Sequence, residues 1–205
     1  CIRDRIWVAR FLKWKHPEVV VKLARRLKKK KYNFHIKMLG TGKLEEKTRK
    51  KVKRLGLEDV LEIVGQVPSD KVKDYMEKAN IFIGTSDSQE GWGAVINESM
   101  NAACALVANK KMGSVPFLIK DGETGLIYTT YKELEDKVKL LINNKELRCK
   151  LGKNAYTFIT EKWTGSVAAN NLIELLDSII NKKEYKIKEG PASKEEGRKN
   201  GKKKI

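Results

Sequence analysis

The sequence predicts an α/β fold: a Rossmann-like domain of three layers with a parallel sheet of about six strands, plus C-terminal helices. Three observations lead to this prediction. Short apolar runs alternate with helical patterns as far as Tyr128, the runs end in turns, and hydrophobic residues form 40% of the 205. Such alternation implies right-handed crossovers and a sheet covered on both faces, with ligands bound at the carboxyl ends of its strands.

The individual elements follow from local patterns in chain order. Apolar runs predict strands at residues 5–11, 33–39, 60–65, 80–85, 104–108 and 126–128. Helices are expected from residue 18 onward, at 43–55, 69–79 and 92–103, briefly at 113–119, and at 131–143, 145–160 and 164–181. Pro17 suits the first position of a helix, Ser69 can cap one, and Gly56 can close one.

The hydrophobic pattern stops after Lys182, which divides the chain into two parts. Residues 1–180 are expected to form the folded domain. Residues 181–205 hold ten Lys or Arg and four Glu, a composition that predicts a basic, disordered tail. The chain starts at Cys1, directly before a strand, which reads as the boundary of a fragment.

The formal net charge of +18 has two interpretations. One is a surface for nucleic acid or an anionic membrane, and the other is a lysine-rich composition with a basic tail. No RNA-binding signature or zinc-finger spacing accompanies the charge, so no nucleic-acid partner is expected. Three cysteines without a pairing pattern, no apolar run of ~20 residues and no signal peptide favour the cytoplasm.

The loop after the fourth expected strand carries two glutamates around a Gly-rich turn. Glu90 precedes the turn and Glu98 follows eight residues later. A carboxylate can accept two hydroxyl groups of a sugar or ribose ring, and glycines allow a ligand to approach the backbone. The alternative is that Glu90 is an ordinary acid at a helix start and that Glu98 is solvated.

The loop after the first expected strand carries two cations, Arg10 and Lys15. A diphosphate bound there would receive charge-assisted hydrogen bonds of ~1.5–3 kcal/mol each. The alternative is that both belong to a solvated charged face, since the chain has 44 basic residues. His16 lies beside Lys15 and is a weaker candidate for a phosphate contact.

The stretch EGWGAVINE, residues 90–98, resembles the E-x7-E motif of the group 1 (family 4) retaining glycosyltransferases of the GT-B fold. Further segments resemble that family in the same order: WVARFLKWKHPE, MLGTG, VGQVPSDKVKDYMEKANIFIGTS, GSVPFLIKDGETGLIY and KWTGSVAANNLIELL. The resemblance covers residues 3–180 and implies the C-terminal, donor-binding half of such an enzyme, without its N-terminal acceptor domain.

The resemblance implies a role for each matching residue. Arg10 and Lys15 would bind the donor diphosphate and stabilise the leaving nucleotide, Glu90 would hold the sugar hydroxyls, and Glu98 would bind the ribose. The implied substrate-binding positions also include Gly91, Trp92 and Gly93 near the sugar and phosphate, and Gly40, Gln66 and Val67 near the base and ribose. The donor would be a UDP- or GDP-linked sugar and the acceptor a hydroxyl of a glycan or lipid-linked glycan. Neither a metal nor a cofactor is implied, because cations neutralise the diphosphate.

The chain departs from the family pattern at three positions, where Ala9, His16 and Ala103 replace glycine. These changes affect the expected loop geometry around Arg10 and Lys15. A different class of function stays open at this point: a non-catalytic basic Rossmann-like module that binds nucleic acid or an anionic membrane surface. The sequence also leaves open a peripheral contact between the basic tail and the inner face of a membrane.

Overall fold

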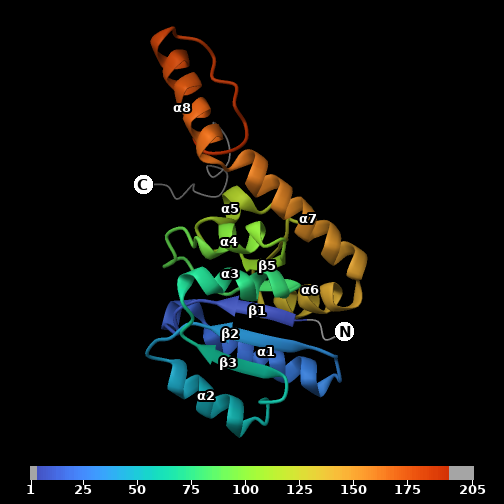
Figure 1. Ribbon diagram of the computed structural model, residues 1–205. Coiled ribbons are helices and arrows are strands. Elements are labelled where there is room, and N and C mark those ends of the chain that lie inside the picture. Colours follow the sequence, from blue (N-terminus) through green and yellow to red (C-terminus); the bar gives the residue numbers. More distant parts are fainter. Residues whose placement is uncertain (1–3, 194–205) are drawn as a thin grey trace.

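The computed structural model describes residues 4–193, in which six parallel strands form one sheet in the order β3-β2-β1-β4-β5-β6 (Figure 1). The strands are β1 (Asp4–Val8), β2 (His35–Leu39), β3 (Leu61–Gly65), β4 (Ile81–Gly84), β5 (Ala105–Asn109) and β6 (Leu126–Tyr128). The helices are η1 (Lys13–Lys15), α1 (Pro17–Lys29), α2 (Glu45–Arg54), α3 (Ser69–Lys78), α4 (Val95–Asn101), α5 (Val115–Leu118), α6 (Tyr131–Asn143), α7 (Lys145–Lys162) and α8 (Gly165–Ile180). The predicted fold class is confirmed.

Strand β1 lies at the point where the strand order reverses. It pairs with β2 along its whole length, from Asp4 opposite His35 to Val8 opposite Leu39. Its other edge pairs with β4. Strands β2 and β3 therefore extend the sheet on one side of β1, and β4, β5 and β6 extend it on the other. Loops that follow β1 and β4 diverge to opposite faces and leave a crevice between them.

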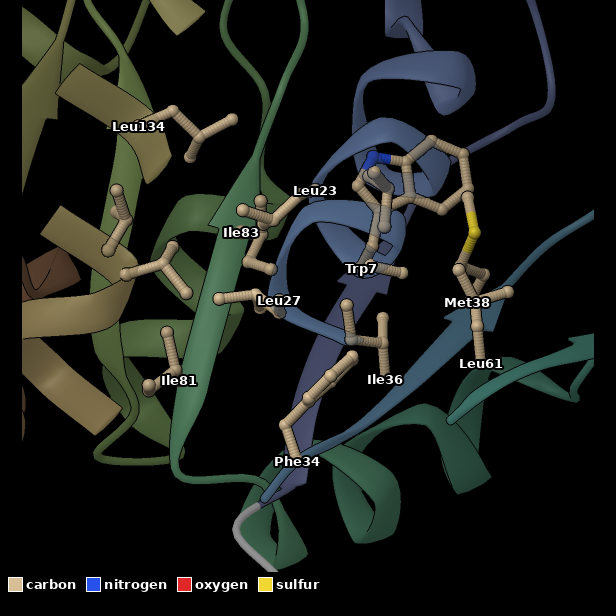
Figure 2. Packing of buried hydrophobic residues seen from close by; sticks show 14 of the residues in the cluster. Trp7, Leu23, Leu27, Phe34, Ile36, Met38, Leu61, Ile81, Ile83 and Leu134 are labelled. Carbon is tan, nitrogen blue, oxygen red and sulfur yellow. The ribbon is translucent and has the colours of Figure 1, made fainter. Parts of the chain in front are cut away.

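Each face of the sheet carries its own hydrophobic core, because neighbouring residues of a strand point to opposite sides. Trp7 faces a core made with α1 and α6, and Figure 2 shows its ring among side chains that include Leu23 and Met38. Ile6 faces the second core, which contains residues of α3, α4, α5 and α7. Both strand residues are only 1% exposed, so β1 is buried on both faces.

Two expected boundaries differ from the structure by three residues, and the others by two or fewer. Strand β1 ends at Val8 and not at residue 11, because the amide of Phe11 donates to the carbonyl of Thr41, in the turn after β2, at 2.8 Å. Helix α4 begins at Val95 and not at residue 92. Gly93 has a φ of 84°, a left-handed conformation that a right-handed helix cannot contain, so the helix can start only after it.

The start of the tail differs from the disorder expected from residue 181. A segment of residues 182–193 runs back along α8 (Figure 1). The side chain of Asn171 on α8 donates to the carbonyls of Glu189 (3.3 Å) and Pro191 (2.9 Å). The carboxylate of Glu189 accepts from Lys120 at 2.5 Å. The rest of the expected tail, residues 194–205, lies outside the described residues.

Helix α8 projects from the body of the domain (Figure 1). It carries an exposed apolar stripe. The stripe consists of Leu172, Ile173, Leu176, Ile179 and Ile180, which are 49–76% exposed. Their spacing of three and four residues places them on one side of the helix. In residues 4–193, no helix is both long and apolar enough to cross a membrane.

Two of the three departures from the family pattern adopt the backbone conformation that glycine would favour. His16 has a φ of 50° and Ala103 a φ of 53°. Side chains with a β-carbon are strained in this region, by roughly 1–2 kcal/mol per residue. The loops therefore keep a glycine-like path despite the substitutions.

Ala103→Gly should stabilise the protein by about 0.5–1 kcal/mol, because glycine relieves the left-handed strain at a cost in unfolded-chain entropy that is smaller than the gain. Ala102→Gly is the matched control, since Ala102 has a φ of −85° and gains nothing from glycine. Urea unfolding of the two variants measures the difference. If Ala103→Gly unfolds at the same or a lower urea concentration than the wild type, Ala103 does not hold this conformation.

Candidate functional site

A cleft of about 300 Å³ opens at the carboxyl ends of β1, β2 and β3 and beside the loop that follows β4. It therefore lies where the strand order reverses, the position at which open parallel sheets bind ligands. Its lining residues are Val8, Ala9, Arg10, Lys15, Leu39, Gly40, Gln66, Val67, Val72, Glu90, Gly93, Ala94, Val95 and Glu98. The cleft brings together eight of the ten residues implied as site residues and leaves out Gly91 and Trp92.

The position of Lys15 is fixed through Thr85, the residue directly after β4. The Thr85 hydroxyl accepts a hydrogen bond from the indole Nε1 of Trp7 at 2.7 Å and donates to the backbone carbonyl of Lys15. Because Trp7 is buried in the core, this chain of bonds ties the loop after β1 to the end of β4. Lys15 is thereby held at the edge of the cleft.

The cleft contains two neighbouring cations and a carboxylate. The ammonium group of Lys15 pairs with the carboxylate of Glu90, and the two side chains are only 15% and 16% exposed. Burial, together with the positive charge of Arg10, lowers the pKa of Lys15. Two cations that repel each other in a partly buried site favour an anion between them, because the anion removes the repulsion.

The loop after β4 presents Glu90 from a tight turn. The amide of Glu90 donates to the carbonyl of Asp87 at 3.1 Å. Gly113 packs beneath this turn so closely that a β-carbon there would lie 1.7 Å from the carbonyl oxygen of Gly91. No other residue type fits at Gly113 without moving the turn that carries Glu90.

Trp92 points away from the cleft. Its ring packs against Phe117 and Trp163, at centroid distances of 5.4 and 5.7 Å, and its Nε1 donates to the side chain of Asn97 at 2.9 Å. The Trp92 side chain therefore supports the loop after β4 from the side that faces away from the cleft. Gly91 has open space where a β-carbon would stand, so contacts within the fold do not require glycine there.

The lining of the cleft also includes the residues that the resemblance associates with base and ribose. Glu98 lies in the first turn of α4, and Gln66 and Val67 follow β3. Gly40 allows the loops after β1 and β2 to touch, because a β-carbon there would lie 2.1 Å from the carbonyl oxygen of Ala9. The two loops can approach this closely only with glycine at position 40.

Charged groups also line other hollows, so the position at the strand ends, and not the charges alone, distinguishes the cleft. A larger one, of about 540 Å³, runs along β1 and α3 and shares only Gln66 and Val67 with the cleft. Among residues 4–193, no group of three or more His, Cys, Asp or Glu side chains is arranged to hold a metal ion. Cys104 is buried, and burial raises the pKa of its thiol to about 12, which makes it a poor nucleophile.

Sequence reasoning missed two residues that shape the cleft, Thr85 and Asp87, and considered His16 only as a candidate for a phosphate contact. The ring Nε2 of His16 lies 2.9 Å from a carboxylate oxygen of Asp87, and the amide of Asp87 donates to the carbonyl of Trp14 at 3.0 Å. The signal available in the sequence was the polar run after β4, but a contact across 71 positions appears only once the strand order is known.

Comparison with known proteins agrees with the fold and identifies the family. Residues 5–158 match the sequence model of the family described as glycosyl transferases group 1. The chain is 33% identical over 131 residues to an uncharacterized glycosyltransferase of Methanocaldococcus jannaschii, covering 63% of this chain and 36% of that protein. It is 31% identical over 127 residues to the putative colanic acid biosynthesis glycosyltransferase WcaL of Salmonella typhimurium, covering 60% and 31%.

Solved structures share the fold. The C-terminal domain of a group 1 glycosyl transferase (LpcC) of Francisella tularensis has a TM-score of 0.68 at 24% identity, covering 78% of this chain and 87% of that one. HepE of Anabaena in complex with UDP-glucose has a TM-score of 0.73 at 18% identity, covering 86% and 49%. The chain spans about a third of the length of the curated relatives named above. Because the family model matches residues 5–158, which is more than half of the chain, this chain belongs to the group 1 glycosyltransferases.

Proposed function

We propose that this chain is the donor-binding half of a retaining glycosyltransferase that moves a sugar from a nucleoside diphosphate to a hydroxyl of a glycan or lipid-linked acceptor. The observation that carries the proposal is the single cleft that holds Arg10 and Lys15 with Glu90 and Glu98. Cations suit a diphosphate and carboxylates suit sugar hydroxyls, so one ligand with both parts satisfies all four side chains.

In this proposal each charged group has its own task. Arg10 and Lys15 bind the diphosphate and neutralise the charge that develops when the bond to the anomeric carbon breaks. Glu90 accepts hydrogen bonds from hydroxyls of the donor sugar, and Glu98 accepts those of the ribose. Lys15 also pairs with Glu90. The bond that joins the diphosphate to the sugar of the donor would therefore lie beside this pair.

We further propose that an acceptor-binding half completes the enzyme. Two observations support this proposal. The curated relatives named above are about three times as long as the matched part of their chains, and α8 presents an apolar stripe that the described residues leave uncovered. A body of protein against α8 would bury the stripe, and acceptor chemistry would then take place between the two halves.

Three finer proposals accompany this function. The donor is UDP- or GDP-linked, in keeping with HepE, whose structures contain UDP, UDP-glucose or glucose. The enzyme acts in the cytoplasm, and the lysines that follow α8 give it a peripheral contact with an anionic membrane. A nucleic-acid module is disfavoured, because two carboxylates line the cleft.

Lys15→Ala should weaken binding of UDP or GDP, whichever the protein binds, by about 1.5–3 kcal/mol, because a charge-assisted hydrogen bond to phosphate is lost. Arg10→Ala should act in the same direction, and the free nucleoside should be affected much less. Lys13→Ala is the matched control, since Lys13 belongs to the same turn but does not line the cleft. Calorimetry measures these affinities, and equal losses for nucleotide and nucleoside would mean damage to the fold.

The two glutamates should differ in the part of the donor that they affect. Glu90→Gln should keep the affinity for the bare nucleotide and reduce the extra affinity that the attached sugar confers. Glu98→Gln should weaken both ligands alike, because both contain the ribose. Calorimetry with a nucleotide sugar and its nucleotide separates these outcomes, and identical behaviour of the two variants would contradict the assignment.

Gly91→Ala tests whether a ligand approaches the backbone of the turn. The space around Gly91 is open, so we expect an unchanged melting temperature with weaker binding of the nucleotide sugar. Gly165→Ala, which also has open space, serves as the control for the substitution itself. Unchanged binding by Gly91→Ala would show that the donor does not approach the backbone of this turn.

Ile173→Ser with Ile179→Ser tests the role of the α8 stripe. In this chain the double substitution should leave the unfolding free energy nearly unchanged, because both side chains are 64% exposed. In a longer protein that contains both halves, the same change should lower the stability by removing buried apolar area. A clear loss of stability in this chain alone would mean that the stripe is covered within it.

A further inference from the structure

His16 occupies an unusual position between the two loops that form the cleft. It follows directly after Lys15, in a left-handed backbone conformation with φ of 50° and ψ of 52°. A residue with a β-carbon is strained there, and glycine or asparagine would fit with less strain. Backbone strain of this kind persists where contacts with the surrounding structure hold the residue in place.

The imidazole ring of His16 bridges two carboxylates from different elements. Its Nδ1 lies 3.0 Å from the carboxylate of Glu18 in the first turn of α1, and its Nε2 lies 2.9 Å from that of Asp87 in the loop after β4. The ring is 32% exposed and the Asp87 side chain 22%, so this contact is partly shielded from water. His16 thereby connects the loop of Lys15 to the loop of Glu90 by side chains.

Asp87 is well placed to transmit this contact to Glu90. Its carbonyl accepts from the amide of Glu90 at 3.1 Å, and its carboxylate accepts from the amide of Gln89 at 2.9 Å. The hydrogen bond from the amide of Gln89, together with the single contact to His16, lowers the pKa of Asp87 and keeps it ionised. Asp87 therefore holds the turn that presents Glu90. His16, which directly follows Lys15, contacts the carboxylate of Asp87.

We propose that His16 is a positioning residue of the donor site: through Asp87 it holds the loops after β1 and β4 in register, so that Lys15 meets the donor diphosphate. The inference rests on the proposed function of the cleft. The ring acts through the two loops and not by touching the diphosphate.

The test compares His16→Gly with the wild type by calorimetry, with UDP, GDP and their free nucleosides as probes. Glycine relieves the backbone strain, so the melting temperature should stay the same or rise, whereas affinity for the nucleotide should fall roughly three- to tenfold. Affinity for the nucleoside should stay unchanged, because Lys15 contacts phosphate. A purely structural role of His16 would not produce a loss restricted to the phosphate-bearing ligand.

Two further variants show whether the effect passes through Asp87. In an Asp87→Ala background, His16→Gly should cause no additional loss, since the partner of the ring is already absent. His16→Asn, which tolerates the left-handed conformation but has a shorter side chain, should behave like His16→Gly. Losses that add up independently in the double variant would overturn the proposal.

The outcomes also separate this inference from the proposed function. If the wild type binds neither UDP nor GDP, nor their sugars, the donor site itself is wrong. If the wild type binds one of them and His16→Gly binds it equally well, the donor site stands and the positioning role of His16 is refuted.

Discussion

The pairing of β1 with β2 on one edge and with β4 on the other is the constraint on which the rest of the structure depends. It reverses the strand order at β1 and brings two loops together that are 70 to 75 positions apart in sequence. Trp7 fixes the junction, since its ring lies in the core and its Nε1 reaches Thr85 at the end of β4. Without that register, Lys15 and Glu90 would not share a cleft.

The sequence predicts the fold class and most of the cleft because both follow from regular patterns. Alternating apolar runs give the parallel sheet, and parallel strands end at a common edge, which places residues such as Arg10 and Glu98 near one another. Composition alone did not distinguish the site residues from solvated surface charges, and the resemblance implied their roles. Eight of the ten implied residues line one cleft, although their chemical roles stay proposals.

The remaining features depend on contacts that no local pattern encodes. The late start of α4 follows from the left-handed conformation of Gly93, and the outward direction of Trp92 follows from its contact with Trp163 at the end of α7. Residues 182–193 lack the apolar content that predicts order, yet Asn171 and Lys120 hold them through backbone and charge contacts. Such contacts join residues that are distant in sequence, so they emerge only from the assembled fold.

The proposed function requires that the cleft binds a nucleoside diphosphate sugar. A thermal-shift series on this chain with UDP-, GDP- and ADP-sugars, their nucleotides and a polynucleotide tests it most directly. Ligand at 100 times its dissociation constant should add ~2.7 kcal/mol of stability. We expect stabilisation by at least one nucleotide sugar and weaker stabilisation by its bare nucleotide, at moderate salt. Stabilisation by the polynucleotide alone, falling steeply with salt, would contradict it.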